Sequence, residues 1–155
     1  MDEHLFASVR ATGLAGFSNV ANSPELMKKS RRDYSTAIQL VNAALRSPAD
    51  VSKDSTLLAV MILSIFEAIS GFNQRSLKAW AEHIHGAAAL VNVRGCEQLR
   101  SREGFRLFNQ VTSGLLMSCI HHDAGEYSRI TNRRLQIYQY LMSRFTGGAY
   151  KHEGN

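Results

Sequence analysis

Proline is scarce in this sequence, with two residues among 155. Runs of β-branched residues are few and short, whereas apolar residues recur at spacings of three and four along most of the chain. Strands would require an alternating pattern instead, and frequent prolines would interrupt helices. The sequence therefore predicts an all-α fold, and its 45% of hydrophobic residues is ordinary for a globular protein.

Cysteine is also rare, because Cys96 and Cys119 are the only two. This number excludes a four-cysteine zinc site within the chain, and their separation argues against a disulfide framework. His83 and His85, two residues apart on a helix, would point about 200° away from each other. The adjacent His121, His122 and Asp123 fit a helix end better than a metal site. We expect no metal and no cofactor.

Long hydrophobic runs are missing as well. The longest, Leu57 to Ile69, is shorter than the roughly 20 residues that span a bilayer. Asp2, Glu3 and His4 stand where a signal peptide would carry its basic and apolar regions. We expect a soluble protein inside the cell, without membrane contact, and a length of 155 residues fits one domain.

What is present is a series of amphipathic helices. Their spacing predicts a single domain of five or six antiparallel helices with short connections, either a bundle or a helical array. Gly13, Gly16 and Asn19 disfavour a long first helix, and Gly147-Gly148 disfavours order at the end. The predicted parts are an N-terminal short helix and loop (1–22), the helical domain (23–146) and a disordered tail (147–155).

Capping residues predict where the helices begin and end. Ser23-Pro24 is a cap followed by proline at the first helical position, and Pro48 stops that helix. Gly71 and Gly95 follow apolar helices and are expected to be left-handed C-terminal caps. The predicted helices run from Ser23 to about Arg46, Asp54 to Gly71, Ser76 to Gly95, Ser101 to Ile120 and Tyr127 to Phe145.

Basic residues gather in two places, within a formal net charge of +5. One cluster contains Lys28, Lys29, Arg31 and Arg32, and a second basic stretch includes Arg129 to Arg144. Such clusters are typical of nucleic-acid contact or nuclear import, and equally of a solvated helix face. The sequence leaves both interpretations open.

Glu67 is the one carboxylate in the apolar helix that begins at Asp54, on the same face as Val60 and Leu63. A buried, unpaired carboxylate costs several kcal/mol, so it needs a partner. On the next helix, five residues share an arc of about 80°: Trp80, His83, Ala87, Leu90 and Arg94. We expect Glu67 to pair with Arg94 or His83 and to fix the helix register. The competing hypothesis is a general base in a pocket lined by Glu67, His83 and Arg94.

Three sequence blocks in this region resemble a known family. They read D-x-x-L-x-A-x-x-x-L-x-x-x-E from Asp54 to Glu67, W-x-x-H-x-x-G-A-x-x-L-x-x-x-R-G from Trp80 to Gly95, and S-x-x-G-x-x-L-F from Ser101 to Phe108. Their order and separation resemble the regulatory (middle homology) domain of fungal-specific transcription factors. The resemblance implies an α-helical regulatory domain in which the motif residues matter structurally and none is catalytic. These residues are Asp54, Leu57, Glu67, Trp80, His83, Gly86, Arg94 and Gly95.

In that family the domain lies downstream of a six-cysteine zinc cluster that binds DNA, which this sequence does not contain. We expect an excised fragment, a truncated family member or a small protein that has reused the helical unit, and in each case no DNA binding in the family's manner. The predicted function is a regulatory or interaction module in the nucleus (alternatively the cytoplasm). It would act through protein partners, through self-association as a homodimer, or through a small-molecule ligand. The alternative is a small helical enzyme of secondary metabolism, with a pocket near Glu67, His83 and Arg94.

Overall fold

The structure, a computed structural model, describes residues 2–71 and 73–121. These residues form five α-helices and one 3-10 helix, with no strand among them, which confirms the all-α prediction. The helices are α1 (Glu3–Ala21), α2 (Pro24–Arg46), α3 (Asp54–Ser70), α4 (Gln74–Arg94), η1 (Gly95–Arg100) and α5 (Arg102–His121). The helix expected from Tyr127 to Phe145 and the tail 147–155 lie outside the described residues.

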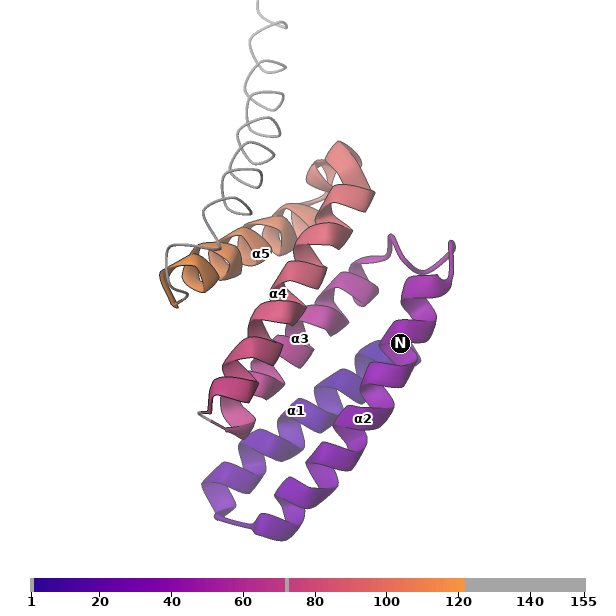
Figure 1. Cartoon of the computed structure of the whole chain (residues 1–155). Helices are drawn as coiled ribbons and strands as arrows, with labels where there is room; N and C mark the ends of the chain where they lie inside the picture. The colour runs from indigo at the N-terminus through magenta and orange to yellow at the C-terminus, as the bar shows by residue number, and fades with distance from the viewer. Residues whose placement is uncertain (1, 72, 122–155) are drawn as a thin grey trace, which may run out of the picture. The chain divides into compact units, whose positions relative to one another are not determined.

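The chain divides into two compact units, one up to Leu115 and one from Leu116 onward. The first unit contains α1 to α4, η1 and most of α5. Of the second unit, only the last residues of α5 belong to the described part. Within the first unit, α1 and α2 form one antiparallel pair, and α3 and α4 form another (Figure 1). In the part of the chain that the structure describes, no helix is both long and apolar enough to cross a membrane.

Local capping explains where most helices begin and end. The Ser23 side chain accepts a hydrogen bond from the Leu26 N–H (3.4 Å), with Pro24 at the first helical position. Ser101 likewise accepts a hydrogen bond from the Gly104 N–H (2.9 Å) at the start of α5. Gly95 ends α4 with a φ of 61°, in the region that glycine favours. The predicted starts at Pro24 and near Ser101, and the end of α4 at Gly95, are therefore confirmed. The conformation predicted for Gly95 was wrong, because its ψ of -159° lies outside the left-handed helical region.

Two predicted caps at the turn between α3 and α4 were wrong. Gly71 has a φ of 173°, so its backbone is extended and not left-handed. Ser76 is already helical, and the N-cap of α4 is Asn73, whose side chain accepts a hydrogen bond from the Ser76 N–H (3.0 Å). The end of α3 is satisfied from elsewhere, because the Asn19 amide of α1 donates to the Ile69 carbonyl oxygen (2.7 Å). A contact between distant segments replaces the expected local cap.

The expected loop within residues 1–22 was also wrong, because α1 is one continuous helix of 19 residues. Glycine in a helix interior costs about 1 kcal/mol relative to alanine. Tertiary contacts offset this cost: α1 buries a row of small residues, and Thr12 donates to the Ile62 carbonyl oxygen of α3 (3.3 Å). The buried small residues of α1 are Ala7, Ser8, Ala11, Ala15 and Ser18.

Not every neighbouring pair of helices is antiparallel. Contacts between α1 and α3 advance in the same direction along both helices, from Thr12–Ile62 to Asn19–Ile69. These two helices therefore run parallel, side by side in the first unit (Figure 1). This arrangement places Phe66 of α3 in a core with Ala11 and Ala15 of α1, against which Tyr34 of α2 packs.

Candidate functional site

Three polar side chains from three different helices meet at the core of the first unit. The hydroxyl of Tyr34 on α2 donates a hydrogen bond to Glu67 Oε1 on α3, at 2.5 Å. The same hydroxyl oxygen lies 2.8 Å from Nε2 of His83 on α4. All three residues are half-buried. We call Tyr34, Glu67 and His83 the polar cluster.

The ring of Tyr34 is held in place by two aromatic contacts, one stacked and one edge-on. It stacks on Phe66, with ring centroids 4.1 Å apart and planes inclined by 12°. The ring of His83 stands edge-on to it, at 6.3 Å and 88°. Because these contacts fix the ring, they also fix the direction of its hydroxyl group.

The hydrogen bonds of the polar cluster determine where its protons lie. A tyrosine hydroxyl has one proton, and Tyr34 gives that proton to Glu67. Its oxygen must therefore accept from His83, so Nε2 of His83 carries a proton. In the neutral imidazole, Nδ1 is then the nitrogen with a free lone pair. The cluster is a directed chain of donors that runs from His83 through Tyr34 to Glu67.

Burial and charge shift the acid–base behaviour of two members of the cluster. Burial raises the pKa of Tyr34 above its ordinary value, and the hydrogen bond to Glu67 raises it further. Burial also lowers the pKa of His83, an effect that the nearby carboxylates of Glu67 and Glu82 partly oppose. At neutral pH these shifts favour a protonated tyrosine, which the donor chain requires, and an uncharged imidazole.

Arg94 lies apart from the polar cluster and makes its ion pair with Asp54, at the start of α3. The pairing of Glu67 with Arg94 was therefore a wrong expectation, and His83 reaches Glu67 only through Tyr34. The reason is position: Arg94 is at the last turn of α4, whereas Glu67 is near the opposite end of the antiparallel α3. The Arg94 side chain is 6% exposed, so the ion pair fastens the second end of the α3–α4 pair.

The remaining motif residues lie in the packing of α3, α4 and η1. Leu57 is fully buried, Trp80 is half-buried, and Gly86 faces Val60 of α3, whose Cγ1 would lie 3.9 Å from an added Cβ. Gly104 of the third block has no room for a side chain, since a Cβ there would collide with the Gln98 backbone carbonyl. The spacing S-x-x-G thus combines a cap at Ser101 with a close backbone approach at Gly104.

Sequence reasoning missed Tyr34 as a member of the site. The helical spacing of Tyr34 from Ile38 and Val41 indicates only that its ring shares their apolar face. A signal was available, because a buried tyrosine hydroxyl requires a hydrogen-bond partner and Glu67 required a donor. The sequence does not show which helices pair. This pairing brings Tyr34 into contact with Glu67, which is 33 positions away in the sequence, and with His83, which is 49 positions away.

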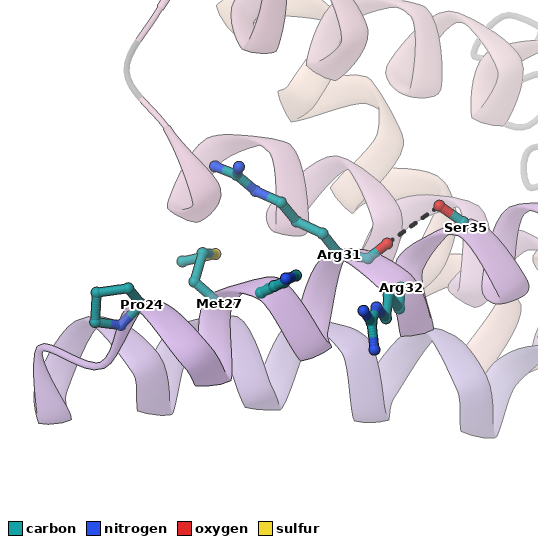
Figure 2. Close-up of a pocket in the computed structure, with 6 residues that line it drawn as sticks. Pro24, Met27, Arg31, Arg32 and Ser35 are labelled. Carbon is teal, nitrogen blue, oxygen red and sulfur yellow. Dashed lines mark hydrogen bonds between the residues drawn. The ribbon is translucent and has the colours of Figure 1, made fainter.

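The basic cluster at Lys28 to Arg32 lies on the surface of α2, where Lys28, Arg31 and Arg32 line an open pocket with Pro24, Met27 and Ser35. Figure 2 shows the side chains of Arg31 and Arg32 pointing in different directions. The hydroxyl of Ser35 donates a hydrogen bond to the Arg31 carbonyl oxygen (3.1 Å), one turn earlier in the same helix. Diverging guanidinium groups do not form a fork around one phosphate, and nucleic-acid contact by this cluster stays a prediction.

The geometry defines an all-α unit in which polar contacts hold the α3–α4 pair at two places. One is the ion pair of Arg94 with Asp54, and the other is the polar cluster. Among residues 2–71 and 73–121, no three His, Cys, Asp or Glu side chains gather where they could hold a metal ion.

Residues 1–148 match the family of the fungal specific transcription factor domain. Since the match spans nearly the whole chain, the protein belongs to this family and is a module of the transcription-regulation type. Comparison with curated proteins and with solved structures finds no match.

Proposed function

We propose that this chain is a regulatory module that acts in the nucleus by binding other proteins through the outer faces of its helices. The observation that carries the proposal is the family match over residues 1–148. The family acts in transcription, and an interaction module needs a rigid arrangement of helices to present its surfaces.

The polar cluster supports this proposal as a fastening of the scaffold. The hydroxyl of Tyr34 both donates and accepts, so its hydrogen-bonding capacity is used within the protein. Glu67 Oε1 likewise accepts its hydrogen bond from within the protein, from the hydroxyl of Tyr34. The contacts join α2, α3 and α4, and so hold three outer surfaces in a fixed relation.

Attachment to DNA is the second part of the proposal. We propose that the module acts at promoters together with a DNA-binding domain, such as the six-cysteine zinc cluster that the family resemblance implies. The exposed basic side chains on α2 would in that case serve nuclear import or an acidic protein surface.

A tethering experiment tests the regulatory function directly. The chain is fused to an unrelated DNA-binding domain, and transcription from a reporter with the matching operator is measured against the DNA-binding domain alone. We expect the fusion to change reporter output, and a Leu57→Asp fusion, which places a charge in the core, to lose the effect. A folded, nuclear fusion that leaves the reporter unchanged would contradict the proposal.

A further inference from the structure

Helix α1 has two apolar faces, and only one of them is used within the described structure. Its buried face contacts α2 and α3 through small residues. The opposite face exposes four large apolar side chains within an arc of about 80°. They are Phe6 (48% exposed), Val9 (48%), Phe17 (60%) and Val20 (87%). We call these four residues and Gly13 the outer stripe.

Gly13 lies at the midpoint of the outer stripe. A Cβ added there would meet nothing within 4 Å, so packing inside the described chain does not require a glycine. An exposed glycine weakens a helix relative to alanine, yet it permits another backbone to approach closely. Its place at the centre of an apolar stripe is that of a crossing point between two helices.

The outer stripe is symmetric about this glycine. Phe6 and Val20 each lie seven residues from Gly13, and Val9 and Phe17 each lie four residues from it. In a dimer with two-fold symmetry, residue i of one copy contacts residue j of the other, and j contacts i. If two α1 helices cross antiparallel at Gly13, Phe6 meets the partner's Val20 and Val9 meets the partner's Phe17. A large apolar residue therefore faces a smaller one at each of the four contacts.

We propose that two copies of this chain associate through the outer stripe, with α1 antiparallel to the partner's α1 and the two-fold axis passing at Gly13. This inference concerns assembly and does not depend on the regulatory function. Arg10 borders the stripe, where it forms an ion pair with Asp33 (3.1 Å) and places its guanidinium group over the Phe6 ring. The same symmetry sets Arg10 opposite the partner's Gly16, so no like charges meet.

The size of the stripe fits a modest interface. A phenylalanine presents about 200 Å² of surface, so the exposed halves of Phe6 and Phe17 amount to roughly 400 Å² over two copies. Specific interfaces begin at about 1,200 Å² of total buried surface. The valines of the stripe and the polar residues beside it must therefore supply the remaining area. Because this total area is at the lower end for a specific interface, we expect a weak dimer that dissociates on dilution.

Cysteine crosslinking tests the symmetry. In a full-length chain with Cys96 and Cys119 replaced by serine, Gly13→Cys places two thiols at the two-fold axis, and mild oxidation should yield a crosslinked dimer. Val9→Cys is the matched control, because the two thiols would then lie about 12 Å apart along the axis. A mixture of Val9→Cys and Phe17→Cys chains should crosslink again. Equal self-crosslinking of Val9→Cys and Gly13→Cys would overturn the antiparallel arrangement.

Sedimentation velocity tests the association itself without any crosslink. We expect the full-length chain to sediment as a dimer at about 100 µM, and Val20→Glu to shift the population to monomer. Val93→Glu on α4, at a valine that is 62% exposed, should leave the dimer intact. A monomeric parent chain that also fails to crosslink through Gly13→Cys would show that the stripe meets another segment or another protein, and the proposal would be wrong.

Discussion

Tyr34 donates its hydroxyl proton to Glu67 across 2.5 Å and thereby joins α2 to α3. The relationship explains why an apolar helix tolerates a carboxylate at this position. The charge of Glu67 receives a directed, charge-assisted hydrogen bond, and the hydroxyl of Tyr34 avoids being buried without a partner. His83 completes the arrangement from α4 by donating to the same oxygen. One hydroxyl group thus connects three helices.

Replacement of Tyr34 by phenylalanine isolates the contribution of this hydroxyl. The ring and its stacking on Phe66 are retained, while Glu67 and His83 each lose a hydrogen-bond partner. We expect Tyr34→Phe to lower the free energy of unfolding by about 1–3 kcal/mol, measured by urea denaturation. Ser35→Ala, one residue away on an exposed position of α2, is the control and should change stability by less than about 0.5 kcal/mol.

The pH dependence of stability follows from His83. Its pKa is lowered in the folded state, so between that pKa and the unfolded value of about 6.5 the unfolded chain binds more protons. Stability should therefore be greatest above about pH 6.5 and decline as the pH falls through the folded pKa. His83→Gln should flatten the decline in a series of melting curves. An unchanged slope in that variant would show that other groups are responsible.

Tyr34 should also resist ionisation at high pH. Its pKa is raised by burial and by Glu67, so the folded state retains the proton where an exposed tyrosine, near pH 10, loses it. The sequence has five tyrosines. In a spectrophotometric titration we expect the tyrosinate signal of the folded protein to have the same amplitude in the parent and in Tyr34→Phe. A smaller amplitude in the variant would mean that Tyr34 titrates with the others.

Two glycine substitutions should have opposite effects. A Cβ at Gly104 collides with the Gln98 carbonyl, which is backbone and cannot rotate away, whereas a Cβ at Gly13 meets nothing. We expect Gly104→Ala to destabilise the fold by more than about 2 kcal/mol. Gly13→Ala should stabilise the monomer by about 0.5–1 kcal/mol, because alanine favours the helix, when unfolding is measured at a protein concentration too low for the proposed dimer. Thermal unfolding of both variants under one condition checks the pair, and equal melting temperatures would refute the steric argument at Gly104.

The features that the sequence predicted correctly are local. Ser23-Pro24 defines the start of α2 through one side-chain hydrogen bond, and α4 ends at Gly95, although not in the left-handed helical conformation that was predicted. Each depends on residues within about one helical turn, which the sequence displays directly. Glu67 and His83 do lie in one cluster, but each of them contacts Tyr34, and the direct pairing that was predicted is not found among the described contacts.

The errors arose where distant segments decide the local structure. Asn19 of α1 caps the end of α3, so Gly71 need not adopt a left-handed conformation. Burial on α2 and α3 keeps α1 helical through Gly13 and Gly16. The polar cluster likewise depends on Tyr34, which lies 33 residues before its carboxylate partner. Helix propensity and spacing contain no information on which helices become neighbours.

The most direct test of the central claim, that Tyr34 and Glu67 fasten the helices together, is a double-mutant cycle in the free energy of unfolding. Tyr34→Phe, Glu67→Ala and the double variant are compared with the parent chain at pH 7 by urea denaturation. We predict that the double variant loses about 1–2 kcal/mol less free energy of unfolding than the sum of the two single losses. The reason is that the second substitution removes a group that has already lost its partner. Strictly additive losses would contradict the claim.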